Sequence, residues 1–165
     1  MREAELLARR PLPRNRESSD RHLAFVEWVE ALGNHAGAHA SLSYEGNVDL
    51  DAAQRLSETL GERFEHLFWL TFEAVENAML HSEAKNLRIE LQSEDERVLL
   101  TVADNGEGIV RTSGSENPER GLGLRAIRNF AHLMDAKLEL GRDANGYGLR
   151  IDLSWQVPRP VARRR

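Results

Sequence analysis

Cysteine is absent from the chain, which excludes disulfides, thiolate metal sites and a cysteine nucleophile. Lysine is scarce: Lys85 and Lys137 stand beside 20 arginines, and the GxxxxGK[ST] phosphate-binding motif is missing. No apolar run approaches the roughly 20 residues that cross a bilayer, and the N-terminus has no apolar signal-peptide segment. We therefore expect a cytoplasmic setting with no membrane contact from this domain.

Charge is unevenly distributed along the 165 residues. Residues 1–21 carry six Arg and four acids (+2), residues 159–165 carry four Arg and no acid (+4), and the remaining 12 basic and 23 acidic residues leave −11. Phosphate binding by nucleic-acid-binding proteins needs clustered positive charge. The acidic body therefore argues against a nucleic-acid partner. Short terminal Arg runs are typical of solvated tails.

Residue periodicity predicts alternating helices and strands. Helical spacing covers about 20–36, 49–79 and 122–134, with Gly61 as a potential interruption, and period-2 alternation covers 39–45, 87–92, 97–103, 137–140 and 149–155. Residues 105–120 are expected to be a long polar loop. Short turns between neighbouring strands predict an α/β two-layer sandwich, with a mixed, largely antiparallel sheet covered on one face by three helices. Residues 1–20 are expected to be a linker, 21–157 the folded domain and 158–165 a basic tail.

Three polar residues occupy one face of the longest predicted helix. Glu73, Asn77 and His81 are spaced by four and so stack a turn apart, beside apolar neighbours. An amide oxygen suits Mg²⁺, and a neighbouring carboxylate can act as a general base. A solvent-exposed face or a polar network in the core remains the alternative.

A second polar segment, Asp104-Asn105-Gly106-Glu107-Gly108, follows a predicted strand. Asn-Gly is a strong hairpin signal, but the polar residues 111–118 cannot form the returning strand. An acid at a strand end followed by two glycines is suited to a ligand that the backbone approaches closely.

The third motif is Gly121-Leu122-Gly123-Leu124 at a predicted helix start, where free N–H groups and the helix dipole attract phosphate. It also matches GxGxxA, but a dinucleotide fingerprint needs a strand immediately before it. A flexible loop with a helix cap is the alternative.

In this order and spacing, the three motifs resemble the GHKL ATP-binding superfamily, which includes gyrase, Hsp90, histidine kinases and mismatch-repair proteins. The segments 73–84 and 121–128 resemble the nitrate-sensor-like subfamily of sensor histidine kinases. The resemblance covers roughly residues 22–157 and implies a Bergerat fold that binds ATP and Mg²⁺.

The resemblance also implies roles for single residues. Glu73 would be the catalytic base, Asn77 the magnesium ligand, and Asp104 the partner of the adenine amino group. Gly106 and Gly108 would let the backbone approach the base, and residues 111–120 would form a lid. The remaining implied nucleotide-binding residues are His81, Ile109, Gly121, Leu122, Gly123 and Leu124.

Three features depart from the family pattern. Leu80 stands where these kinases usually carry Lys or Arg, and Tyr147 lies near the usual threonine of the last motif. The chain also lacks a recognisable phosphoacceptor histidine within a dimerisation helix; the helix after His22 is too short to supply one.

Three functions are compatible with these patterns. The favoured hypothesis is the ATP-dependent catalytic domain of a two-component sensor histidine kinase. It would transfer the γ-phosphoryl group to a histidine on a separate phosphoacceptor and dimerisation helix, and a response regulator would be the indirect partner. The second is a stand-alone regulator of the anti-sigma-factor type, either a serine kinase or a partner-sequestering module. The third is a degenerate nucleotide-binding module that gates a partner.

Overall fold

The computed structural model describes residues 20–81, 83–108, 118–142 and 148–158. Five strands form one sheet in the order β1-β2-β3-β5-β4. They are β1 (Ser43–Val48), β2 (Asn86–Glu94), β3 (Arg97–Asp104), β4 (Lys137–Gly141) and β5 (Arg150–Gln156). Strand β1 pairs with β2 in parallel, and all other pairs are antiparallel. The predicted mixed, largely antiparallel sheet is confirmed.

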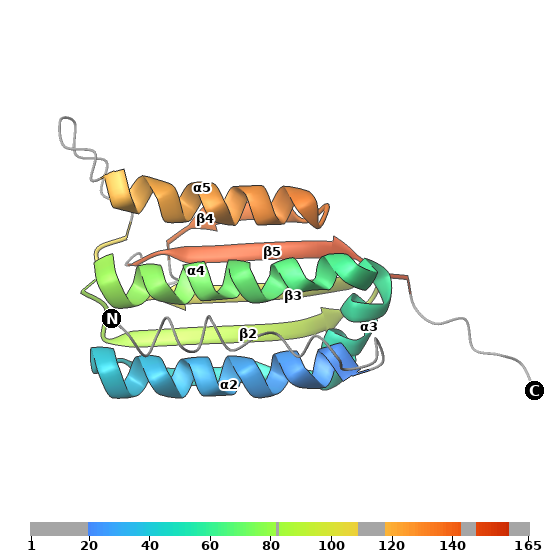
Figure 1. Cartoon of the computed structure of the whole chain (residues 1–165), viewed down its shortest axis with the longest axis horizontal. Helices are drawn as coiled ribbons and strands as arrows, with labels where there is room; N and C mark the ends of the chain where they lie inside the picture. The colour runs from blue at the N-terminus through green and yellow to red at the C-terminus, as the bar shows by residue number, and fades with distance from the viewer. Residues whose placement is uncertain (1–19, 82, 109–117, 143–147, 159–165) are drawn as a thin grey trace, which may run out of the picture.

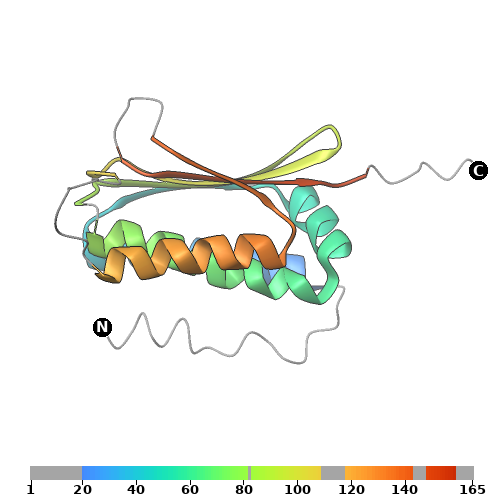
Figure 2. The ribbon, with the colours of Figure 1, turned by 90° about the horizontal axis from the view of Figure 1, so that it is seen from above.

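Three helices cover one face of the sheet (Figures 1 and 2). They are α2 (Arg21–Ala40), α4 (Glu65–His81) and α5 (Pro118–Leu133). A shorter helix, α3 (Leu50–Leu60), stands at one end of this layer. The predicted two-layer α/β sandwich is therefore confirmed.

Alternation along the strands separates a buried face from a polar one. In β2, the apolar side chains Leu87, Ile89 and Leu91 are buried against the helices, while their neighbours are half-buried or exposed. The opposite face carries side-chain pairs such as Thr101 with Asp152 (2.6 Å between oxygens). One buried and one polar face is the pattern of an antiparallel sheet that faces water on one side.

The long helix predicted over 49–79 is divided in two. Asp49 caps α3 by accepting a hydrogen bond from the Ala52 amide (2.7 Å), and α3 ends at Gly61, whose φ is 57°. A 3₁₀ turn, Gly61–Phe64, then leads into α4. Glycine adopts positive φ without the steric cost that a Cβ imposes, so the predicted interruption becomes a full change of direction.

Three other predicted boundaries are wrong. The first helix continues to Ala40 rather than 36, because its final residues are helix-compatible and it ends only where Ser41 adopts a left-handed φ of 54°. The strand predicted at 39–45 consequently shifts to Ser43–Val48, where it pairs in register with β2. The predicted loop 105–120 also ends early, since Pro118 begins α5. Proline suits a first helical position because its φ is already helical and its missing N–H is not needed.

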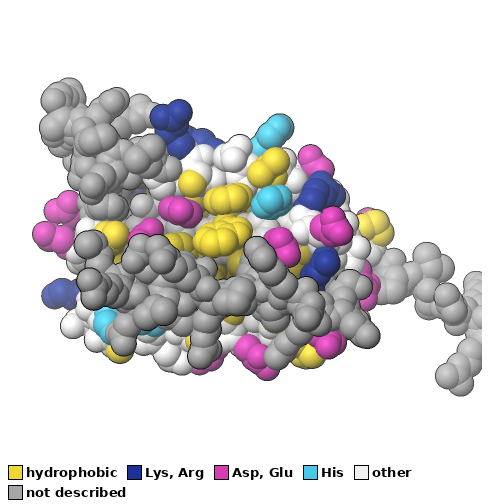
Figure 3. Space-filling view, viewed as in Figure 1, with side chains coloured by type: hydrophobic (Ala, Val, Ile, Leu, Met, Phe, Trp, Pro, Cys, Tyr) yellow, Lys and Arg dark blue, Asp and Glu magenta, His cyan; other side chains and the backbone are white. Residues whose placement is uncertain are grey.

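The core between sheet and helices is closed by aromatic packing and one anchoring hydrogen bond. Phe25, Phe64 and Phe68 meet edge to face, with ring centroids 5.1–6.0 Å apart. The Trp155 indole donates to the Met134 carbonyl (3.2 Å), which joins β5 to the end of α5. On the outer side of the helices, Trp69 and Leu133 remain partly exposed, and hydrophobic side chains are visible between acidic ones (Figure 3).

No helix within these described ranges combines the length and apolarity needed to cross a membrane.

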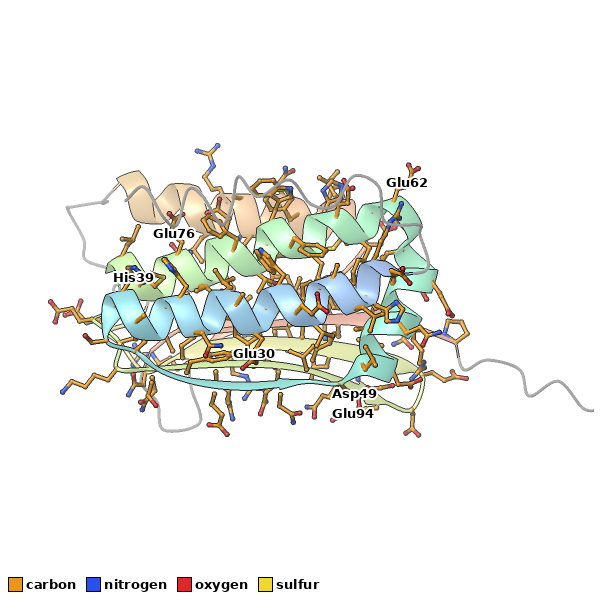
Figure 4. The ribbon with its side chains drawn as sticks, turned by 60° about the horizontal axis from the view of Figure 1, so that its bottom comes forward. Glu30, His39, Asp49, Glu62, Glu76 and Glu94 are labelled. Carbon is orange, nitrogen blue, oxygen red and sulfur yellow. The ribbon has the colours of Figure 1, made fainter. Side chains whose placement is uncertain are left out.

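Tyr44 of β1 fits into a notch that two glycines leave open. A Cβ on Gly33 of α2 or on Gly46 would overlap the Tyr44 side chain. Burial, with a smaller contribution from Glu30, raises the pKa of Tyr44 to about 12. Glu30 lies on α2, the helix that packs over β1 (Figure 4). The phenol therefore stays neutral at physiological pH, and Gly33 sets how closely α2 approaches the sheet.

We predict that Gly33→Ala destabilises the fold, because its Cβ would overlap the Tyr44 ring. Overpacking of this kind costs about 1–3 kcal/mol, partly offset by the roughly 1 kcal/mol helix-propensity gain of alanine. Urea unfolding measures the effect. Gly37→Ala is the comparison variant, because it is the same substitution in the same helix and its Cβ would meet a much milder contact, the Leu42 carbonyl oxygen at 3.2 Å. Equal changes in the two variants would contradict the prediction.

Candidate active site

Two residues of the polar stripe predicted on α4 (Glu73, Asn77 and His81), namely Glu73 and Asn77, are half-buried on a helix that lies between α2 and α5 (Figure 1). Glu73 and Asn77 lie one turn apart on this helix. Burial, and secondarily the charge of Glu76, raises the pKa of the Glu73 carboxyl. Glu76 lies on the same helix, near its C-terminal end (Figure 4). A carboxylate with a raised pKa is a stronger base than an ordinary glutamate, which suits proton abstraction near neutral pH.

The Asn77 amide lies against α5. Its Nδ2 is buried without a hydrogen-bond partner within the described ranges. A Cβ on Gly123 would lie only 2.7 Å from Asn77 Oδ1, so glycine is required for α5 to pack over this amide. Buried polar groups normally have partners, so an uncommitted buried amide is the kind of group that a ligand completes.

Asp104 ends β3 with its side chain 5% exposed. Its Oδ1 accepts hydrogen bonds from the amides of Gly106 (2.9 Å) and Leu149 (3.4 Å), and its own amide donates to the Leu149 carbonyl (3.0 Å). Backbone donors on two sides therefore fix the carboxylate. A buried acceptor held in this way can recognise a ligand N–H group with high selectivity.

Two glycines determine how close the connection that precedes β5 comes to the Asp104 carboxylate. Gly108 and Gly148 both have φ of 73°. A Cβ on Gly108 would lie 2.5 Å from the Gly148 carbonyl oxygen, and one on Gly148 would overlap the Asp104 carbonyl. Thus Gly108 makes a close backbone contact within the protein, and its approach to a ligand stays a prediction.

Gly148 and Leu149 were missed by sequence reasoning. The sequence predicts a turn at 143–146 between the last two strands, but the contact of Gly148 with Asp104 depends on the β3–β5 pairing. That pairing joins residues about 50 apart, and local pattern does not encode it. Tyr147, singled out as a departure, lies outside the described residues.

The structure places the other predicted residues as follows. His81 ends α4, while Gly121 and Leu122 lie in the helical backbone of α5; the side chains of these residues fall outside the description. Leu124 is half-buried against the core, and Leu80 is 62% exposed. Gly106 lies in the loop beside Asp104, where its amide binds the carboxylate. Ile109 and residues 111–117 of the expected lid lie outside the described residues.

In the described residues, no group of three or more His, Asp and Glu side chains is placed to hold a metal ion. Mg²⁺ typically takes one or two protein oxygens and obtains its other ligands from water and phosphate. The side-chain oxygens of Asn77 and Glu73, a turn apart, fit a magnesium site of that kind and do not fit a cage built from protein alone, whereas the unpartnered Asn77 Nδ2 is a donor that suits an acceptor on a ligand.

The sequence profile of histidine kinase-, DNA gyrase B- and HSP90-like ATPases matches residues 62–159, more than half of the chain. The chain belongs to this ATPase family. The matched range contains α4, the Asp104 loop, α5 and the final hairpin, which together carry every element of the candidate site. The family resemblance inferred from the three motifs is therefore confirmed, and the domain is of the ATP-binding kind.

Relatives of this ATPase domain are sensor kinases. It is 31% identical over 109 residues to the signal transduction histidine-protein kinase/phosphatase DegS of Bacillus subtilis, covering 59% of this chain and 28% of DegS. It is 36% identical over 67 residues to the sensor protein VraS of Staphylococcus aureus, covering 41% of this chain and 18% of VraS. The chain thus spans less than a third of either relative.

Solved structures agree on the fold. The histidine kinase AdeS of Acinetobacter baumannii superposes with a TM-score of 0.61 at 19% identity, covering 96% of this chain and 75% of that one. The histidine kinase domain of the Erythrobacter litoralis EL346 blue-light activated kinase gives 0.59 at 19% identity, with coverages of 94% and 72%.

We predict that Glu76→Gln lowers the pKa of Glu73, because it removes one of the two causes that raise it. Carbon-13 NMR of the glutamate carboxyls measures the titration directly. Glu65→Gln, at the exposed start of the same helix, is the matched control and should leave the Glu73 titration unchanged. A Glu73 pKa that stays the same in Glu76→Gln would contradict the electrostatic explanation.

Proposed function

We propose that this chain is the catalytic domain of a two-component sensor histidine kinase, formed by residues 21–157. It binds Mg-ATP and transfers the γ-phosphoryl group to a histidine on a separate segment or chain. The observation that carries the proposal is that the domain holds both a buried carboxylate fixed by backbone amides, Asp104, and the half-buried polar groups Glu73 and Asn77 on α4. The family match and the sensor-kinase relatives support it.

Asp104 would recognise the base. Adenine presents an exocyclic amino group that donates hydrogen bonds, and a fixed, buried carboxylate is a matching acceptor. The two backbone amides that donate to Oδ1 hold the carboxylate in a fixed orientation for the ligand. Guanine carries a carbonyl at the equivalent position, which would leave two acceptors facing each other.

Asn77 and Glu73 would act at the phosphate end. Mg²⁺ bound there would neutralise phosphate charge that develops during transfer. Asn77 would supply a neutral oxygen ligand, and Glu73 would accept the proton of the attacking imidazole. Because burial favours its protonated form, Glu73 is a base only above its raised pKa. Transfer should therefore decline as pH falls through that pKa.

The phosphoacceptor is proposed to lie on a dimerisation helix of a sensor kinase, with a response regulator as the onward partner. Positioning and electrostatic stabilisation carry most phosphoryl-transfer catalysis, so the docking of that helix would decide the rate.

The predicted phosphate contacts from Gly121 and Gly123 belong to this proposal. In α5 the Gly123 amide lies beyond the first helical turn, so phosphate binding there would require a local change at the start of the helix.

We predict that Asp104→Asn abolishes or strongly weakens ATP binding, because the amide replaces an acceptor oxygen by a donor. Isothermal titration calorimetry with and without Mg²⁺ measures the effect; losing a charged hydrogen bond costs at least roughly ten-fold in affinity. Asp51→Asn on the exposed first turn of α3 is the matched control. Asn77→Ala should instead remove the Mg²⁺ dependence. Native affinity in Asp104→Asn would contradict the base-recognition role.

We also predict that Glu73→Gln binds Mg-ATP but transfers phosphate at least about 100-fold more slowly, as expected when a general base is lost. The assay supplies a sensor-kinase dimerisation helix in trans and detects acid-labile phosphohistidine. Native transfer rates in Glu73→Gln would refute the role of the base. Acid-stable phosphoserine on a partner would favour the anti-sigma-factor type of regulator.

A further inference from the structure

Asn105, the residue after Asp104, makes a connection that none of the roles above requires. Its side-chain Oδ1 accepts hydrogen bonds from two consecutive backbone amides, those of Lys85 (2.9 Å) and Asn86 (2.8 Å). Its own amide donates to the Asn86 carbonyl (3.4 Å). One side chain thus ties the loop after β3 to the residues that begin β2.

The residues held by Asn105 belong to the connection that leaves α4. Helix α4 ends at His81 and β2 begins at Asn86, so Lys85 and Asn86 close a connection of four residues. The Lys85 carbonyl accepts a hydrogen bond from the Ser43 amide of β1 (2.7 Å). Asn105 is therefore linked, through Lys85, to a third strand, and it fixes the point at which the chain that follows α4 enters the sheet as β2.

The β2–β3 ladder does not provide this connection itself. Its last pair at this end is Leu87 with Asp104, so Asn105 lies just beyond the register. Beyond that pair, the side-chain oxygen of Asn105 takes the place of a strand carbonyl and accepts from the amides of both Lys85 and Asn86. Asparagine suits this position because its short side chain bonds backbone groups readily where regular structure ends.

We propose that Asn105 is a positioning residue that sets the separation between Asp104 and the polar stripe of α4. The inference rests on the proposed function, because ATP is the ligand that must contact both places. Asp104 ends β3 and the stripe lies on α4, and the Asn105 bonds join the loop after β3 to the start of β2, the strand that follows α4 along the chain. A ligand that bridges two pockets gains affinity when their spacing is fixed beforehand, whereas a ligand that fills one pocket gains little.

The test compares Mg-ATP with adenosine, which occupies only the base pocket, by calorimetry. In Asn105→Ala, the Kd for Mg-ATP should rise roughly ten-fold, as expected for two lost hydrogen bonds, while the Kd for adenosine stays within about two-fold. Asn105→Asp keeps an acceptor oxygen for both amides and should restore Mg-ATP affinity to within about three-fold of native. Asn129→Ala, on an exposed position of α5, is the matched control.

Three results would overturn the positioning role alone: equal weakening of both ligands, unchanged Mg-ATP affinity in Asn105→Ala, or failure of Asn105→Asp to rescue. Native protein that binds neither ligand would instead overturn the proposed function, and the role of Asn105 with it. A second measurement needs no variant. Amide hydrogen exchange at Lys85 and Asn86 should be slowed in the native protein, and free exchange there would show that the connection does not form.

Discussion

The close approach of Gly148 to the backbone of Asp104 is the contact on which the candidate site depends. No Cβ fits between these two backbone segments. Gly108 and Gly148 both adopt a positive φ there. Because the hairpin comes so near, the Leu149 amide reaches the carboxylate and the Leu149 carbonyl receives the Asp104 amide. Asp104, the proposed acceptor for the adenine amino group, is thus held in place by the sheet. A residue larger than glycine at position 108 or 148 would force the two backbone segments apart.

The helical layer completes the site from the other side under a similar constraint. Gly123 lets α5 pack over the Asn77 amide, much as Gly33 lets α2 pack over Tyr44. In both cases a missing side chain on one element makes room for a polar or aromatic one on its neighbour. Glu73, a turn from Asn77, is half-buried in the same helical layer, and that burial is the larger cause of its raised pKa. Geometry and acid–base properties therefore have a common origin in how closely the layers approach.

Much of this arrangement follows from local pattern. Alternation in 87–92 and 97–103 placed two central strands correctly, and the strand-end position of Asp104 followed directly. The wrong predictions concern element boundaries. Strand β1 begins later than expected because its pairing with β2 sets the register. Helix α5 begins earlier than expected, at Pro118 within an otherwise polar segment. Arg55 shows the limit most clearly. A charged helix residue is expected on the solvent-exposed face, yet Arg55 is buried. Its guanidinium donates hydrogen bonds to the Ser93 hydroxyl and to the carbonyls of Asp95 and Val157, which offset the cost of burial.

The pairing of β3 with β5 also has a consequence for how the protein is made. The two strands are separated by a helix and another strand, so β2 and β3 can form their hairpin long before β5 leaves the ribosome. Contacts between distant segments form late because chain closure must come first. Until Gly148 and Leu149 arrive, Asp104 lacks its second set of backbone partners. A nascent or prematurely terminated chain ending before residue 148 would therefore have the elements that carry all three sequence motifs, α4, β3 and α5, but no finished base pocket.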